Sequence, residues 1–156
     1  MASPISVLWR VLGAVIAVLL VLTILGSVLG LPMGISYVET GSMEPQLEPY
    51  DGFIAIPTAI TGPVETGDVV VFDAVETGGG GLTTHRVVGE TEEGDITQGD
   101  DVAFTDQQTG EPPVQEGQIR AKALQIGDKI VVIPKIGLAV VGIGSAIESV
   151  QRTLAG

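Results

Sequence analysis

The sequence contains no cysteine and a single histidine among its 156 residues. The absence of cysteine excludes disulfide bonds, thiol catalysis and metal sites with cysteine ligands. A single histidine argues against a catalytic zinc site, and no H-E-x-x-H motif, P-loop or twelve-residue calcium loop occurs. The sequence therefore predicts neither a bound metal nor an organic cofactor.

Basic residues are also scarce: 7 stand against 19 acidic residues, and the formal net charge is −12. Such a surface repels phosphate groups, so we expect no nucleic-acid partner. Eighteen of the acids lie within residues 39–128, interleaved with apolar runs, which favours a folded domain with a carboxylate-rich surface over a disordered tail. Such a surface repels itself, but at 1 M salt screening shortens the reach of this repulsion to about 3 Å. The acidic surface therefore suits a salt-rich medium, and we expect a halophilic source.

Charge and proline are absent from one long apolar segment, residues 11–31. At 1.5 Å per residue a helix of this length spans the roughly 30 Å hydrocarbon core of a bilayer. Trp9 and Arg10 precede it, as expected for an interfacial anchor with a cytoplasmic N-terminus. The sequence predicts a transmembrane anchor in the cell membrane, with the rest of the chain outside the cytoplasm. The alternative is a cleaved signal peptide, whose apolar core would run only about 7–15 residues.

Beyond the anchor, residues 32–134 alternate short apolar runs, rich in β-branched residues, with turns marked by glycine, proline and aspartate. This pattern predicts an all-β domain. The clearest predicted strands cover residues 35–38, 52–56, 68–72, 82–88 and 130–133. Four glycines at 78–81 predict a flexible hairpin tip, and residues 106–113 predict another loop.

The C-terminal segment, residues 135–156, begins with an apolar stretch at 136–147. This stretch is short for a membrane span, and extending it to Val150 would include the charge of Glu148. We expect a short apolar helix on the membrane surface or partly inserted, with a second span and a buried core helix as alternatives. The predicted organisation is a cytoplasmic N-terminus (1–10), the anchor (11–31), the β domain (32–134) and this segment.

Residues 40–45, Thr-Gly-Ser-Met-Glu-Pro, lie about ten residues beyond the apolar segment. Gly41 permits a tight turn and Pro45 fixes φ, so Ser42 is predicted to sit on a shaped loop just above the membrane surface. A hydroxyl presented in this way is a candidate nucleophile. An ordinary turn is the simpler alternative.

The single histidine, His85, is the natural base for such a serine. Histidine is the side-chain type best suited to general-base chemistry near neutral pH. Lysine is the alternative, but the first lysine in the sequence is Lys122. Because a lone histidine is more often structural, residue chemistry alone supports only an anchored β domain with a candidate serine–histidine site.

A carboxylate that orients the imidazole would complete a catalytic triad. The acids that follow the histidine in a suitable region are Asp100, Asp101 and Asp106. Each is equally explained as a solvated surface carboxylate, since acids are abundant throughout the domain. Residue chemistry leaves the choice among them open.

Four segments of the chain resemble conserved boxes of type I signal peptidases. Residues 40–45 resemble the family's S-G-S-M-E-P box, and 67–72 (G-D-V-V-V-F) its G-D-I-V-V-F strand. Residues 84–88 (T-H-R-V-V) resemble its H-R-V box, and 97–101 (T-Q-G-D-D) its T-K-G-D-N segment. The boxes occur in the family's order, and the resemblance covers roughly residues 8–140. Histidine where bacterial members have lysine resembles the archaeal and endoplasmic-reticulum branch.

This resemblance implies a signal-peptidase-like β fold and a serine endopeptidase that removes signal peptides from exported preproteins at the outer membrane face. Ser42 matches the family's nucleophile and His85 its general base. Asp106 falls where the triad acid is expected, and Asp100, which matches the other aspartate that this branch requires, is the second choice. Thr40 replaces the first serine of the box but keeps a hydroxyl, which would share the oxyanion with the Ser42 N–H. The implied partners are signal peptides, the lipid bilayer and the protein translocation machinery.

Two alternatives remain open at this stage. A related self-cleaving peptidase of the same fold would generally pair serine with lysine and lack a membrane anchor. A non-catalytic, membrane-tethered binding module would be indicated by loss of Ser42 or His85, and both residues are present.

Overall fold

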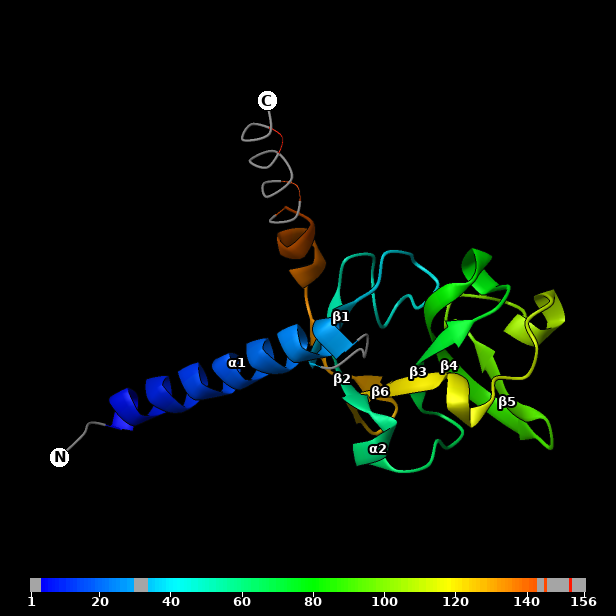
Figure 1. The fold of residues 1–156 in the computed structure, drawn as a ribbon, viewed down its shortest axis with the longest axis horizontal. Helices are drawn as coiled ribbons and strands as arrows, with labels where there is room; N and C mark the ends of the chain where they lie inside the picture. The colour runs from blue at the N-terminus through cyan, green and yellow to red at the C-terminus, as the bar shows by residue number, and fades with distance from the viewer. Residues whose placement is uncertain (1–3, 30–33, 143–144, 146–151, 153–156) are drawn as a thin grey trace.

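The computed structural model describes residues 4–29, 34–142, 145 and 152. A long N-terminal helix projects from one end of a β domain (Figure 1). In chain order the elements are α1 (Pro4–Leu29), β1 (Gly34–Tyr37), β2 (Gly52–Pro57), α2 (Thr58–Thr61), β3 (Val69–Ala74), η1 (Thr77–Gly79), β4 (Gly81–Thr91), β5 (Gly94–Gln98), η2 (Asp106–Thr109), η3 (Glu116–Gln118), β6 (Ile119–Ala123), β7 (Gln125–Ile126), β8 (Lys129–Ile130) and β9 (Val132–Ile133), where η marks a short 3-10 helix.

Seven strands form one sheet in the order β1-β2-β6-β3-β4-β5, with β9 also paired to β2. Every pairing in this sheet is antiparallel. β7 and β8 form a separate two-stranded ribbon. The sequence-based prediction of a mostly β chain with one long apolar N-terminal helix is therefore confirmed for the described residues.

β3 is buried on both of its faces, which places it at the centre of the core. Val69 and Val71 belong to one apolar cluster, whereas Val70 and Phe72 belong to another. This division follows from the strand period of two, which sends successive side chains to opposite faces of the sheet. Full burial of such a side chain contributes roughly 1.5–3 kcal/mol. The strand thus forms a fixed support for its neighbour β4, which carries His85.

The boundaries of three predicted strands, 35–38, 52–56 and 68–72, lie within two residues of β1, β2 and β3. β4 (81–91) is longer than the strand predicted at 82–88, because its hairpin with β5 continues the hydrogen-bonded ladder to the pair Thr91–Gly94. The prediction of a single strand at 130–133 is wrong. β8 pairs with β7 whereas β9 pairs with β2, so the chain changes partner between them.

The two predicted loops contain short 3-10 turns. The glycine run at 78–81 overlaps η1 in the β3–β4 connection, and all four glycines have positive φ, which residues with a Cβ rarely adopt. The predicted loop at 106–113 contains η2. A capping box holds η2, in which Thr105 and Gln108 exchange side-chain and backbone hydrogen bonds.

α1 begins before the predicted segment and is described as far as Leu29. Its apolar side chains are exposed, including Leu8, Trp9 and Val21. By length and composition it is the one helix among the described residues able to cross a membrane, with the candidate span at Ile5–Gly26. Its C-terminal end contacts the β domain, where the Ile35 N–H donates to Thr23 Oγ1 at 3.1 Å, and a helix this apolar and this exposed fits the predicted anchor.

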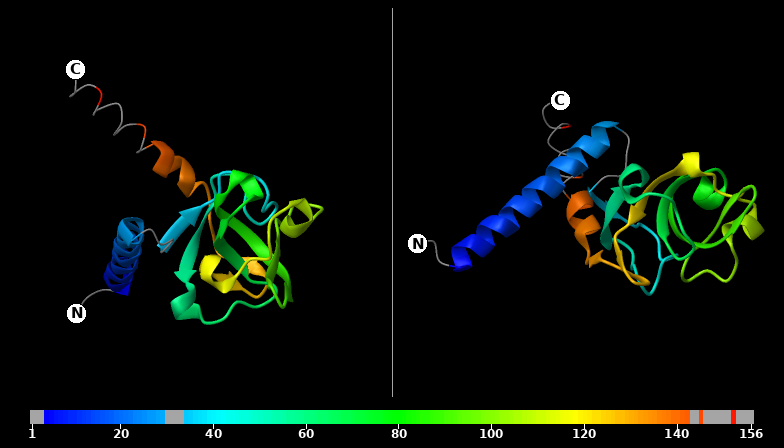
Figure 2. Two further views of the ribbon diagram at one scale, coloured as in Figure 1. Left: turned by 45° about the vertical axis from the view of Figure 1, so that its right-hand side comes forward. Right: turned by 90° about the horizontal axis from the view of Figure 1, so that it is seen from below.

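The predicted C-terminal helix is described only at its start, where residues 136–142 are helical. Figure 2 shows this turn and α1 on the same side of the β domain, next to β1. Gly137 lies against the ring of Tyr37, where a Cβ would come within 2.7 Å of the ring. Most of residues 143–156 lie outside the described part of the chain, so the predicted surface helix or second span remains a prediction.

Candidate active site

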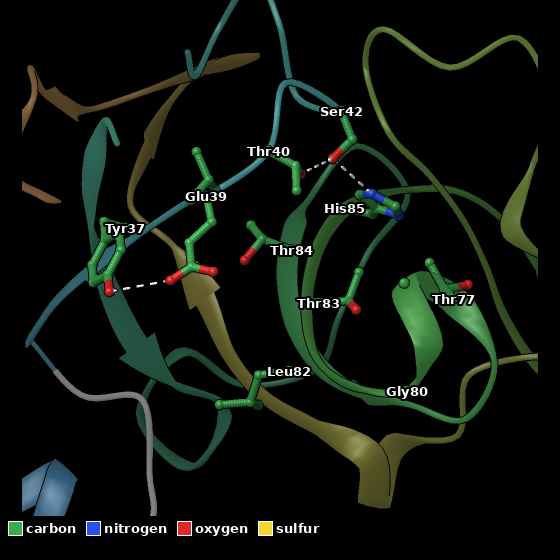
Figure 3. Close-up of a pocket in the computed structure, with 12 residues that line it drawn as sticks. Tyr37, Glu39, Thr40, Ser42, Thr77, Gly80, Leu82, Thr83, Thr84 and His85 are labelled. Atoms are coloured by element: carbon green, nitrogen blue, oxygen red, sulfur yellow. Dashed lines mark hydrogen bonds between the residues drawn. The ribbon is translucent and has the colours of Figure 1, made fainter. Parts of the chain in front are cut away.

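Ser42 lies on the loop that connects β1 to β2. The next side chain, Met43, is fully buried, as is Leu47, whose N–H donates to the Met43 carbonyl at 2.9 Å. On the other side, the Asp101 N–H donates to the Ser42 carbonyl at 3.0 Å. Burial of Met43 and this backbone contact fix the loop, and the Ser42 side chain lines a groove (Figure 3).

His85 lies on β4, directly opposite Val70 of the buried strand β3. The residue is only 5% exposed, and its ring centroid is 6.5 Å from that of Phe72. Its Nε2 atom lies 3.1 Å from Ser42 Oγ. The packing of β4 on the core therefore holds the imidazole at hydrogen-bonding distance from the serine.

Asp106, at the start of η2, is 4% exposed and contacts the other ring nitrogen of His85. The distance from His85 Nδ1 to Asp106 Oδ2 is 2.8 Å. Thr97 Oγ1 donates to the same carboxylate oxygen at 2.7 Å. Because an ionised carboxylate only accepts hydrogen bonds, this network assigns the imidazole proton to Nδ1 and leaves Nε2 able to accept the Ser42 proton.

Asp100, the second choice for the orienting acid, contacts a different residue. It accepts two hydrogen bonds from Arg86, at 2.8 Å from Nε and 2.7 Å from Nη2. Arg86 also donates to the Gly67 carbonyl at 2.8 Å. The hydrogen bond to Asp100 raises the pKa of the Arg86 guanidinium. Asp100 thus restrains the residue next to the histidine, and among the two candidate acids it is Asp106 that contacts His85 itself.

Gly99 is a further site residue, and in the sequence it stands out only as the central residue of the 97–101 segment. A Cβ at this position would lie 2.5 Å from the Ser42 carbonyl oxygen and 3.2 Å from His85 Nε2. The backbone can therefore pass this close to the serine and histidine only because position 99 has no side chain. The close approach depends on the packing of loops that are 57 residues apart in the chain, which no local pattern reveals.

Two candidate oxyanion donors lie beside the serine. Thr40 Oγ1 is 3.3 Å from Ser42 Oγ, and either hydroxyl can act as the donor in that contact. Within the described residues, no acceptor is found for the backbone N–H of Ser42. Both groups are therefore available to a negative oxygen that forms next to the serine.

The groove in front of Ser42 has a volume of about 610 Å³. Residues 37–42 and residues 77–85 contribute its two walls (Figure 3). The lining residues are Tyr37, Val38, Glu39, Thr40, Ser42, Thr77, Gly78, Gly80, Leu82, Thr83, Thr84 and His85. The lining residues are mostly small or uncharged, and an open groove of this size next to the serine can accept an extended peptide.

The lysines, which are the alternative bases, are placed elsewhere. Lys122 Nζ lies 2.6 Å from Asp68, and Lys135 Nζ lies 2.7 Å from Glu48. In the described part of the chain no lysine has a hydrogen bond to Ser42. Nor do the described residues contain a group of three or more histidine, aspartate or glutamate side chains placed to hold a metal ion.

Comparison with known proteins assigns no family. No protein-family model matches the chain, and a search of curated proteins finds no significant match. The features that bear on function are the geometry around Ser42 and His85 and the four short segments that resemble signal peptidase boxes.

Proposed function

We propose that the protein is a membrane-anchored signal peptidase I, a serine endopeptidase that removes N-terminal signal peptides from exported preproteins. The observation that carries the proposal is the continuous array from Ser42 Oγ through the imidazole of His85 to the Asp106 carboxylate, with distances of 3.1 and 2.8 Å. This order of groups is that of a serine nucleophile, a general base and an orienting acid. The motif resemblance assigns the same three roles to the same three residues.

In the first half of the reaction, His85 Nε2 takes the proton from Ser42 Oγ as the oxygen bonds to the carbonyl carbon before the cleavage site. Asp106 holds the Nδ1 proton and stabilises the imidazolium that forms. The tetrahedral intermediate then collapses. The C–N bond breaks, the leaving amine receives the proton from His85, and the signal peptide remains attached to Ser42 as an ester.

In the second half of the reaction, water attacks the ester carbonyl. His85 removes a proton from this water and returns it to Ser42 Oγ when the C–O ester bond breaks. The products are the free signal peptide carboxylate and the regenerated serine. No group other than the triad and water is needed for proton balance.

The negative oxygen of each tetrahedral intermediate would be bound by the Ser42 N–H and the Thr40 hydroxyl. Such donors act most strongly where charge develops in the transition state, and loss of one typically raises the barrier by about 2.7–4 kcal/mol. The Ser42 N–H is an attractive donor because it has no other acceptor within the described residues.

The substrate would bind in the groove as an extended strand, with its side chains directed alternately into shallow pockets. The small residues expected at positions −1 and −3 are implied by the family resemblance. α1 would confine the enzyme to the membrane in which the signal peptide is inserted. This confinement would raise the effective concentration of the signal peptide at the active site. The proposal includes an N-terminus in the cytoplasm and a β domain outside it, near the protein translocation machinery.

The proposal is tested by incubating the detergent-solubilised protein with a preprotein at high salt and weighing both products by mass spectrometry. We expect one cut, at the junction of signal peptide and mature protein. Ser42→Ala should give no product. Ser36→Ala is the matched control, because Ser36 lies on β1 and does not line the groove. A folded wild-type protein that cuts none of several preproteins would instead favour the non-catalytic binding module.

A further inference from the structure

Glu111 is a carboxylate inside the domain with an unusual set of partners. Its residue is 3% exposed, and none of the ion pairs found in the described residues includes it. Instead it accepts three backbone hydrogen bonds: from the N–H of Val75 at 2.8 Å, of Glu76 at 2.7 Å and of Thr77 at 2.8 Å. The carboxylate oxygens thus serve as hydrogen-bond acceptors for the N–H groups of three successive residues, a role that backbone carbonyls usually have.

These hydrogen bonds account for the presence of a charge at a buried position. A carboxylate removed from water is strongly destabilising unless it is paired or hydrogen-bonded. Burial by itself would raise the pKa of Glu111, but the N–H groups of Val75, Thr77 and Glu76 together lower the pKa below its ordinary value. Hydrogen bonds to an ionised acceptor are about twice as strong as those between neutral groups, so the turn is held firmly.

The turn held by Glu111 leads directly into one wall of the groove. Thr77 and Gly80 line the groove on the side opposite Tyr37 and Glu39 (Figure 3), and Gly78 between them is also a lining residue. Gly78 and its neighbour Gly79 have positive φ, and a Cβ built on either would have no heavy atom within 4 Å. This part of the wall therefore has no side chains at its glycines to pack it in place. Its backbone is held by the hydrogen bonds from Gly79 N–H to the Glu76 carbonyl and from Gly80 N–H to the Thr77 carbonyl, and by the pairing of Gly81 with Ala74, so its position depends in part on the residues that Glu111 anchors.

Glu111 also belongs to the segment that supplies the candidate triad acid. Its own N–H donates to the Asp106 carbonyl at 3.0 Å, which closes the turn after η2. The six residues 106–111 therefore contact His85 at one end and the groove wall at the other. η2 has its own support in the capping box between Thr105 and Gln108, which does not involve the Glu111 side chain.

We propose that Glu111 is a positioning residue for the peptide-binding groove. Its carboxylate fixes the turn at 75–77, and through it the glycine-lined wall, relative to the Ser42–His85–Asp106 array. The inference rests on the proposed peptidase function. Because the capping box holds Asp106 independently, removal of the Glu111 charge loosens the wall and weakens substrate binding, while the chemical step at Ser42 continues.

The test compares Glu111→Gln with the wild type in preprotein cleavage, with kcat and KM measured separately. We expect KM to rise about tenfold or more while kcat stays within about threefold, the pattern of lost binding rather than lost transition-state stabilisation. Glu93→Gln is the matched control, since Glu93 is an exposed acid at the tip of the β4–β5 hairpin. Amide hydrogen exchange at residues 75–77 should accelerate in Glu111→Gln and stay unchanged in Glu93→Gln.

Wild-type KM in a folded Glu111→Gln variant would overturn the inference, as would a loss confined to kcat. If Glu111→Gln does not fold, Glu111→Asp is used under the same criteria, because a side chain shorter by one methylene withdraws the carboxylate from the N–H groups of residues 75–77. Failure of the underlying function gives a different result: the wild type itself would not cleave. An active wild type with an unaffected variant therefore rejects the role of Glu111 alone.

Discussion

Asp106 Oδ2 lies 2.8 Å from His85 Nδ1, although the two residues are 21 positions apart and belong to different elements. The same oxygen accepts the hydroxyl hydrogen of Thr97 from β5. β4, β5 and η2 therefore meet at one buried carboxylate. If the protein is a serine peptidase, this contact determines which nitrogen of the histidine is free to act as the base.

Asp106→Asn should lower kcat by about 10⁴-fold, because an amide at this position can stabilise the wrong histidine tautomer and cannot stabilise the imidazolium. Asp100→Asn is the informative comparison, since Asp100 binds Arg86. It should lower the free energy of unfolding by about 1–3 kcal/mol and reduce kcat much less than Asp106→Asn. The measurements are steady-state cleavage and urea denaturation of both variants. The reverse order of the two kcat losses would contradict the assignment of Asp106 as the orienting acid.

Gly99→Ala should lower kcat strongly although it changes no group of the candidate triad. The new Cβ would lie 2.5 Å from the Ser42 carbonyl oxygen, so the serine loop must move away from His85. A displacement of about 1 Å at a reacting group can lower the rate about 100-fold, and we expect a loss of kcat of that order. Gly117→Ala is the control, because a Cβ there would have no heavy atom within 4 Å and the residue does not have positive φ. Equal kcat values for the two variants would refute the close packing of Gly99 on Ser42.

The candidate site was predictable as a set of residue types but not as an arrangement. Ser42 and His85 could be selected because the chain has one histidine and because residues 40–45 carry a turn signature. Residue chemistry could not separate Asp106 from Asp100, since the choice depends on the β4–β5 register and on η2, and only the motif resemblance ranked Asp106 first. Glu111 gave no signal at all: it is one of 19 acids, and its partners lie 34 to 36 residues earlier.

The fold divides in the same way. Short apolar runs rich in β-branched residues, bounded by glycine, proline or aspartate, located β1, β2 and β3 to within two residues. The order of the strands in the sheet could not be predicted in this way, because β6 lies between β2 and β3 through contacts between residues that are distant in sequence. The switch of partner between β8 and β9 likewise depends on which strand is adjacent to each, and the apolar run 130–133 carries no sign of it.

Stability should depend on pH through Glu111. The hydrogen-bonded carboxylate has a lowered pKa in the folded protein, so it stabilises the fold above its unfolded pKa of about 4.3 and this stabilisation is lost as the pH falls through the lower, folded value. The difference in unfolding free energy between wild type and Glu111→Gln should therefore be largest near neutral pH and shrink below about pH 4.3. Urea denaturation of both proteins, at several pH values from neutral to below about 4.3, measures this difference in unfolding free energy. A difference that stays constant or grows on acidification would show that Glu111 is not held as a carboxylate.

Stability should also rise with salt. The net charge of −12 makes the folded state repel itself, and salt screens that repulsion. We expect the melting temperature to increase steadily from dilute buffer to about 2 M KCl, where the screening length is shorter than about 3 Å. Sucrose at matched osmolality controls for general solvent exclusion. Full stability in dilute buffer, with no response to KCl, would argue against adaptation to a salt-rich medium.

The central claim, that Ser42 and His85 act as one catalytic unit, is tested most directly by a double-mutant cycle on preprotein cleavage in detergent at high salt. Ser42→Ala, His85→Ala and the double variant are compared with wild type, and circular dichroism establishes that each is folded. Residues that act as a unit have non-additive effects, so each single substitution should abolish nearly all activity and the double variant should be no slower than either. Cleavage that survives Ser42→Ala, or a double variant whose loss is the product of two moderate single losses, would contradict the account.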